Sequence, residues 1–203
     1  MYYGQFDTDE VIEKLFPKGY IGNCVEVGAY DGIKGSNTLF FEDSGWNCLC
    51  VEPIHKQYLK CKQNRIHAVN FACDCYIGLD SFTVFDIGES HINSSLSSLR
   101  TDPRLLESHS NLINKIEIEK VHVDTLTNIL YRQKWPKNID FVSIDTEGTE
   151  LNVLRGIDFD VFKIKFLVVE NNFDDKDITD YLKDFKYKKI DRYRINDFYE
   201  LQA

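Results

Sequence analysis

The stretch "IDFVSIDTEGTELNVLRG" (139–156) decides the fold, because it joins a strand, a polar turn and a helix in one short run. The apolar run 139–144 has the length of a buried strand and is followed by Asp145. The helical pattern that follows ends at Gly156, a residue that commonly terminates helices. Strand, turn and helix in this order form the repeating unit of a parallel sheet covered on both faces. The stretch therefore predicts an α/β fold.

Similar units recur on both sides of this stretch. We expect further apolar strands at "GNCVEVGA" (22–29), "NCLCVEP" (47–53), "HAVNFACD" (67–74), "SFTVFDI" (81–87) and "IKFLVVENN" (164–172), and two short strands at "YKKIDRY" (187–193) and "DFYEL" (197–201). A chain of 203 residues without repeats or long linkers predicts a single domain, 1–203. Segment 88–115 breaks the alternation: it is polar, serine-rich and interrupted by Pro103, so we expect a lid or acceptor-binding insertion there.

Charge and hydropathy narrow the class of protein. The formal net charge is −9, which disfavours a nucleic-acid partner because nucleic-acid binding draws on lysine and arginine. Every apolar run is shorter than the roughly 20 residues needed to span a bilayer. The N-terminal stretch also lacks the basic and then apolar pattern of a signal peptide. These features predict a cytoplasmic protein without a membrane span.

Acids and amides follow the expected strands at the edge where ligands bind in doubly wound sheets. The turn after the first strand, "GAYDG" (28–32), lets a ligand approach the backbone closely at Gly28. Glu52, at the end of the next strand, can accept both ribose hydroxyls. The spacing G-x-x-x-G lacks the middle glycine of a dinucleotide turn, and Asp31 would repel pyrophosphate. S-adenosylmethionine has a ribose, an amino group and a sulfonium but no phosphate, so it suits this pattern. A NAD-dependent sugar oxidoreductase or epimerase uses a similar sheet and ribose acid and remains the alternative.

Four sequence blocks carry a family resemblance. In order along the chain, they are "VEVGAYDGIKGSNT" (25–38), "VEP" (51–53), "VHVDTL" (121–126) and "IDFVSIDTEGTELNVLRGIDF" (139–159). They resemble the successive blocks of the FkbM family of S-adenosylmethionine-dependent methyltransferases. The resemblance implies a class I methyltransferase fold, which is Rossmann-like: a seven-stranded, mostly parallel sheet with an antiparallel last strand and helices on both faces. It also implies O-methylation, commonly of sugars or natural products.

The resemblance also implies roles for individual residues. Asp145 stands where the methyl group of the donor should face the acceptor. Glu52 matches the acid that binds the ribose, and Ala72 and Cys73 occupy the stretch that borders the adenine. The first cofactor motif of the family corresponds to Glu26, Gly28, Tyr30, Asp31 and Gly32.

Removal of a proton from the acceptor hydroxyl can follow two routes. In the first, Asp145, Glu170 and Asn171 coordinate Mg²⁺ or Mn²⁺ through oxygen, an arrangement similar to that of metal-dependent catechol-type O-methyltransferases. In the second route, His91 in segment 88–115 is the general base. The candidate contacts to the acceptor are Ser94, Ser95 and Glu147.

We therefore expect an O-methyltransferase that acts on a hydroxyl of a sugar or glycan, alongside glycosyltransferases of the same pathway. A methyltransferase acting on another small molecule is an alternative. An amino methyltransferase of nucleic-acid bases is less favoured, because "DTEG" (145–148) stands where many such enzymes carry an N-P-P-Y type motif.

Overall fold

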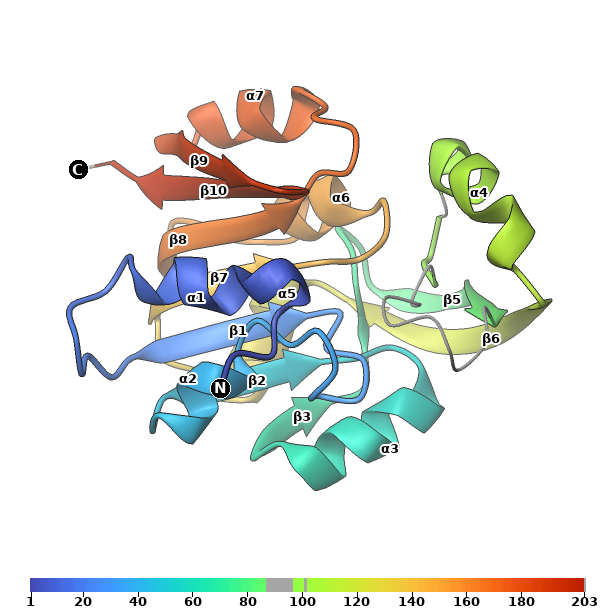
Figure 1. The fold of residues 1–203 in the computed structure, drawn as a ribbon, viewed down its shortest axis with the longest axis horizontal. Helices are drawn as coiled ribbons and strands as arrows, with labels where there is room; N and C mark the ends of the chain where they lie inside the picture. The colour runs from blue at the N-terminus through green and yellow to red at the C-terminus, as the bar shows by residue number, and fades with distance from the viewer. Residues whose placement is uncertain (87–96, 101, 203) are drawn as a thin grey trace.

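The computed structural model describes residues 1–86, 97–100 and 102–202 and contains a main sheet of seven strands (Figure 1). Their order is β3-β2-β1-β7-β8-β10-β9. All strands are parallel except β10, which is antiparallel to both of its neighbours, β8 and β9. The expected mostly parallel sheet with an antiparallel last strand is confirmed. The strands are β1 (Asn23–Val27), β2 (Asn47–Val51), β3 (His67–Val69), β7 (Asn138–Ile144), β8 (Lys163–Glu170), β9 (Tyr187–Tyr193) and β10 (Asn196–Leu201).

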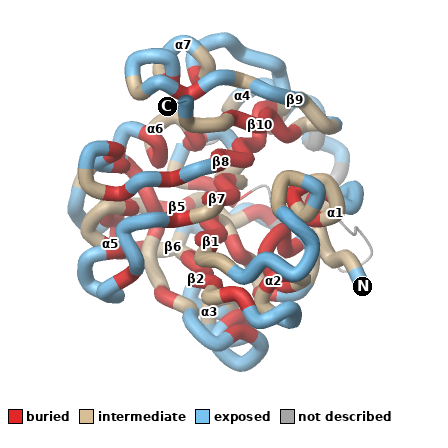
Figure 2. The backbone as a smooth tube through the Cα atoms, turned by 90° about the vertical axis from the view of Figure 1, so that its left-hand side faces the viewer, coloured by how far each residue is buried: buried red, intermediate tan, exposed pale blue. Residues whose placement is uncertain are grey.

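Helices cover both faces of this sheet. On one face, α1 (Thr8–Glu13) and α2 (Leu39–Asp43) pack on side chains such as Cys24 and Phe141, and α3 (His55–Asn64) packs on Cys50. On the other face, α5 (Leu126–Arg132), α6 (Glu150–Arg155) and α7 (Asp177–Lys183) pack on side chains such as Val25. Because successive side chains of a strand point to opposite faces, both faces need apolar residues, which explains the continuous apolar runs in the sequence. In Figure 2 most residues of β1 and β7 are coloured as buried, whereas the exposed residues lie mainly in the peripheral helices and loops.

A second sheet of three strands lies beside the main one, in the order β4-β6-β5. Its strands are β4 (Ala72–Cys73), β5 (Gly78–Asp86) and β6 (Lys115–Asp124). The single strand expected over 67–74 is therefore wrong, because it divides between the two sheets. Asn70 marks the division: its side-chain amide donates to the carbonyl oxygens of Glu52 and Pro53, both at 2.8 Å. These bonds hold Asn70 beside the residues that follow β2, at the point where β3 has ended and the chain passes to the second sheet.

The expected insertion lies between β5 and β6. Its described part contains α4 (Pro103–His109) and the short 3-10 helix η2 (Ser110–Leu112). Asp102 caps α4 by accepting a hydrogen bond from the backbone N–H of Arg104 at 2.8 Å. In Figure 1 the second sheet and α4 lie at the end of the main sheet toward which β8 points. None of the helices in the described ranges has both the length and the apolar character to cross a lipid bilayer.

Candidate active site

A cavity of about 370 Å³ opens at the carboxyl ends of the parallel strands. Its volume falls in the range of roughly 300–1,000 Å³ that is typical of small-molecule sites. Gly28, Glu52, Asp145 and Glu170 all line it, and they follow or end β1, β2, β7 and β8. The main sheet therefore brings together four residues that are far apart in the sequence.

The turn after β1 leaves no room for a side chain at Gly28. This residue has a φ of +90°, and a Cβ atom built there would lie 1.8 Å from the carbonyl oxygen of Asp145. Its N–H donates to the carbonyl oxygen of Val51 at 3.0 Å. The backbone of the turn thus lies directly against the ends of β7 and β2. Such a close approach requires glycine, which also leaves space for a ligand beside the backbone.

Glu26 does not line the cavity. Its carboxylate instead forms hydrogen bonds that hold the loop after β1. Its carboxylate accepts hydrogen bonds from Ser36 Oγ at 2.7 Å, Thr38 Oγ1 at 2.6 Å and the N–H of Asn37 at 2.6 Å. The guanidinium of Arg65 lies 3.3 Å from the same carboxylate. Glu26 therefore holds the loop that follows β1. Its direct contact with the cofactor stays a prediction.

Two further residues of the predicted cofactor motif also shape the loop rather than line the cavity. Asp31 Oδ1 accepts from the backbone N–H groups of Ile33 at 2.9 Å and Lys34 at 2.8 Å. Gly32 has a φ of +81°, and a Cβ atom there would lie 2.6 Å from the side chain of Arg65. Tyr30, by contrast, lines the cavity together with Gly28.

Glu52 is held rigidly at the end of β2. Its two carboxylate oxygens accept from the N–H groups of Tyr30 and Ile54, both at 2.8 Å. Burial raises the pKa of Glu52 to about 8, since only 4% of the residue is exposed. A carboxylate oxygen accepts more than one hydrogen bond, so Glu52 can still receive the hydroxyls of a ribose.

One part of the cavity is largely apolar. Ala72 and Cys73, predicted to border the adenine, line it and are both 3% exposed. Their apolar neighbours in the lining are Pro53, Ile54, Phe71, Phe82 and Leu99. Such a surface suits the flat, largely apolar faces of a purine.

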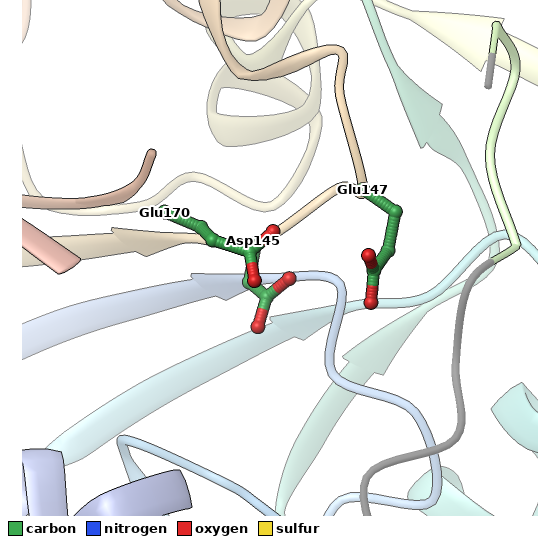
Figure 3. Close-up of side chains that lie close together, drawn as sticks. All are labelled: Asp145, Glu147 and Glu170. Carbon is green, nitrogen blue, oxygen red and sulfur yellow. The ribbon is translucent and has the colours of Figure 1, made fainter. Parts of the chain in front are cut away.

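Three acids meet in another part of the cavity. One carboxylate oxygen from each of Asp145, Glu147 and Glu170 lies within 4.8 Å of the other two. Figure 3 shows Asp145 and Glu170 side by side, with Glu147 facing them from the turn after β7. Glu147 has a φ of +57°, a strained conformation for a residue with a side chain. We call these three residues the acid cluster.

Burial perturbs the acid cluster strongly. Burial, and then the nearby charge of Glu150, raise the pKa of Asp145 to about 7. Burial and the charge of Asp145 raise the pKa of both Glu147 and Glu170. Glu170 is 4% exposed, and its Oε2 has no hydrogen-bond partner among the described residues. A buried oxygen without a partner and three convergent carboxylates fit a hard divalent cation or another positive group.

Asn171 does not join this cluster, in contrast to its predicted role as a metal ligand. Its side-chain amide donates to Asp197 Oδ2 at 2.8 Å and to the carbonyl oxygen of Asp175 at 2.9 Å. Its Oδ1 accepts from the N–H of Asp175 at 2.9 Å. Neighbouring residues at a strand end point in opposite directions, so Asn171 stabilises the turn after β8 while Glu170 faces the cavity. The third carboxylate beside Asp145 and Glu170 comes instead from Glu147, a residue predicted to contact the acceptor.

A second cavity of about 190 Å³ adjoins the first, because Leu105, Glu170 and Asn172 line both. The guanidinium of Arg104, from α4, lies at this second cavity and donates to the carboxylate of Asp175 at 2.6 and 3.1 Å. The described part of the predicted insertion therefore borders the site. His91, Ser94 and Ser95 lie outside the described residues.

Sequence reasoning missed the part of the lining that comes from the N-terminal segment. Gln5 and Phe6, in the 3-10 helix η1 (Gln5–Asp7), line the main cavity. The segment reaches it because Gly4 forms a β-bridge with Gly35 in the loop after β1. No motif marks these residues, since only the folded chain brings them to the strand ends. Lys34, Asn172 and Ile195 also line the cavity without having been predicted.

Solved methyltransferase structures share this fold. A structure of the METTL16 methyltransferase domain superposes with a TM-score of 0.50 at 12% identity, covering 96% of this chain and 65% of its own. The N-terminal domain of human METTL16 in complex with S-adenosylhomocysteine also gives 0.50 at 12% identity, covering 98% of this chain and 70% of its own. The chain thus spans about two thirds of these structures, and the likeness concerns the fold alone. No curated protein is similar enough in sequence to count as a relative.

The sequence match identifies a family, which is more specific than the fold that the solved structures share. Residues 26–189 match the methyltransferase FkbM domain, a range that begins at the end of β1 and includes the acid cluster and most of the main sheet. This match supports S-adenosylmethionine as the bound cofactor and methyl transfer as the chemistry, so the NAD-dependent alternative is set aside. The chain belongs to the FkbM family of methyltransferases.

Proposed function

We propose that this protein transfers a methyl group from S-adenosylmethionine to a hydroxyl group of a sugar or glycan. The observation that carries the proposal is the acid cluster, which lines the same cavity as Gly28 and Glu52. It contains a buried carboxylate oxygen that has no hydrogen-bond partner within the described parts of the chain. Carboxylates accept hydrogen bonds from the several hydroxyls of a sugar, and one of them can take up a proton.

The order of the strands supports one orientation of the donor. The adenine would lie on the apolar lining at Ala72 and Phe82, and the ribose at Glu52, directly after β2. The next strands in the sheet are β1, followed by Gly28, then β7, followed by Asp145, and then β8, which ends at Glu170. The methyl group would therefore face the acid cluster. The second cavity, which is lined by Arg104 and Asp175 among other residues, would receive the acceptor.

The residues of this chain would align the reactants and remove the proton of the acceptor. A carboxylate with a pKa of about 7, as at Asp145, is well suited to act as a general base near neutral pH. In the metal-assisted form of the reaction, Asp145, Glu147 and Glu170 would hold Mg²⁺ or Mn²⁺. When bound, the donor supplies a methyl group activated by its sulfonium, and a divalent cation would lower the pKa of the acceptor hydroxyl.

Calorimetric titration with S-adenosylhomocysteine tests the donor site, with NAD as the competing ligand and with or without Mg²⁺ or Mn²⁺. We expect binding of S-adenosylhomocysteine and none of NAD. The variant Glu52→Ala removes the group that would bind both ribose hydroxyls, and it should weaken this binding about tenfold or more, because each hydrogen bond contributes about 0.5–1.5 kcal/mol. Binding of NAD in preference to S-adenosylhomocysteine would contradict the proposal.

Methylation of a panel of monosaccharides and methyl glycosides tests the acceptor side. Asp145→Asn should abolish turnover while binding of S-adenosylhomocysteine is largely kept. Asp160→Asn is the matched control, because Asp160 is fully exposed and lies outside the cavity lining. Full turnover by Asp145→Asn would rule out its catalytic role. Methylation of an amine and of no hydroxyl compound would overturn the proposed acceptor class.

A further inference from the structure

We propose that Lys34 binds the α-carboxylate of the donor and so fixes the orientation of its amino-acid end. This inference rests on the donor orientation given above and extends it to a group for which no partner has yet been assigned. S-adenosylmethionine carries one negative group, its carboxylate, together with an ammonium and a sulfonium. This carboxylate needs a partner within a cavity whose charged lining residues are mostly acids.

The charges of the lining side chains indicate one partner for the carboxylate of the donor. Glu52 and the acid cluster are carboxyl groups, which offer no positive charge to attract the carboxylate of the donor. Among the cavity-lining residues that the structure describes, Lys34 is the one with a cationic side chain. The acids suit the ammonium and the sulfonium, whereas Lys34 suits the carboxylate.

Backbone N–H groups are the usual alternative for binding an anion at a glycine turn. In this loop the protein already uses most of them. The N–H groups of Gly28 and Ala29 donate to Val51, that of Tyr30 donates to Glu52, and that of Gly32 donates to Ala29. The further N–H groups of the loop that donate to protein acceptors belong to Ile33, Lys34, Ser36, Asn37, Thr38 and Leu39. Most N–H groups of this loop therefore already have a protein acceptor, which favours a side chain as the partner of the donor carboxylate.

The backbone of Lys34 is held in place on both sides. Asp31 Oδ1 accepts from its N–H at 2.8 Å, and the next residue, Gly35, forms a β-bridge with Gly4 of the N-terminal segment. The Lys34 ammonium lies 6.0 Å from the centre of the Tyr30 ring, which also lines the cavity. Lys34 thus lines the cavity beside the turn that follows β1, and its ammonium lies near a second lining residue. Asp31 is then a positioning residue for Lys34.

The test compares two ligands that differ only in the carboxylate. They are S-adenosylhomocysteine and its decarboxylated form, 5′-(3-aminopropylthio)-5′-deoxyadenosine, titrated calorimetrically into the full chain. The wild-type protein should bind S-adenosylhomocysteine more than tenfold tighter. Lys34→Met should weaken S-adenosylhomocysteine about ten- to hundredfold, as expected for a charge-assisted hydrogen bond. It should leave the affinity for the decarboxylated ligand within about twofold.

Two control variants complete the experiment. Lys34→Arg keeps the charge and should retain most of the affinity for S-adenosylhomocysteine. Lys60→Met removes an exposed lysine of α3 that is outside the cavity lining, and it should change neither affinity. Unchanged binding of the decarboxylated ligand to Lys34→Met also shows that this variant is folded.

The outcomes separate the two proposals. If Lys34→Met weakens both ligands equally, or weakens neither, the carboxylate assignment is wrong while the donor site stands. If the wild-type protein binds S-adenosylhomocysteine no tighter than its decarboxylated form, the assignment is also overturned. If the wild-type protein binds neither ligand, the donor site itself fails, and this inference fails with it.

Discussion

Single residues at the strand ends determine how closely the chain can approach the bound donor. Gly28 is the clearest case, because its backbone lies against the carbonyl oxygen of Asp145 and its φ is +90°. The same contact ties the turn after β1 to the end of β7, where the acid cluster begins. A change at Gly28 should therefore affect both the stability of the chain and the shape of the cavity.

Replacing Gly28 by alanine should destabilise the protein by about 3 kcal/mol or more, because the new Cβ would overlap a backbone atom and the residue would be strained. Binding of S-adenosylhomocysteine should be lost as well. Gly19→Ala is the matched control: Gly19 has a φ of +77°, but a Cβ atom there would meet nothing within 4 Å. That variant should cost about 1 kcal/mol from backbone strain alone. Urea unfolding measures both, and equal losses would show that the contact with Asp145 does not matter.

At the scale of elements, the loop after β1 depends on a residue from the end of α3. Arg65 follows α3, and its buried guanidinium contacts the carboxylates of Glu26 and Glu42 at 3.3 and 3.1 Å. It also donates to the carbonyl oxygen of Gly32 at 3.2 Å and to Thr38 Oγ1 at 2.8 Å. One side chain therefore joins α3 and α2 to the loop that borders the donor site.

Arg65→Met should lower the free energy of unfolding by about 3–5 kcal/mol, because it leaves two buried carboxylates without their cation. Arg65→Lys should restore little of this loss, since an ammonium cannot donate to several fixed acceptors as a guanidinium does. Arg104→Met provides the comparison. Arg104 pairs with Asp175 but its side chain is 49% exposed, so the variant should cost less than about 1 kcal/mol. Similar costs for the two methionine variants in urea unfolding would contradict this account.

For the whole molecule, the acid cluster and Glu52 link folding to pH. Burial raises the pKa of Glu52 to about 8 and that of Asp145 to about 7, well above their ordinary values of 4.5 and 3.8. Between the ordinary and the raised value, the folded protein holds protons that the unfolded chain has released. Stability must therefore fall as pH rises through this range.

Thermal and urea unfolding of the ligand-free protein between pH 5.5 and 8 should show this decrease. Each group contributes up to about 1.4 kcal/mol per pH unit while it is protonated in the folded state and ionised in the unfolded state. Glu52→Gln should make the dependence on pH shallower, because the amide does not titrate. Stability that is constant or rises over this range would contradict the raised pKa values, as would an unchanged slope in Glu52→Gln.

Much of the fold could be predicted from local sequence. Apolar runs of strand length, followed by polar turns and helical patterns, indicate the parallel sheet, and the block 139–159 indicates its family. Prediction failed where local pattern carries little information. The first half of β6 is largely exposed and alternates charged and apolar residues, so its sequence does not resemble a buried strand. The division of 67–74 between two sheets depends on the contacts of Asn70 with the end of β2.

The sequence by itself determined which residue types stand at the strand ends: a glycine turn, an acid after β2, and acids after β7 and at the end of β8. Only the tertiary structure decided which of them meet. It brings Glu147 to Asp145 and Glu170, turns Asn171 toward Asp197, and uses Glu26 to support a loop. It also brings Phe6 to the cavity from the start of the chain. The physical reason is that side-chain direction and contacts between distant segments depend on packing in three dimensions, whereas residue type and periodicity are local properties of the chain.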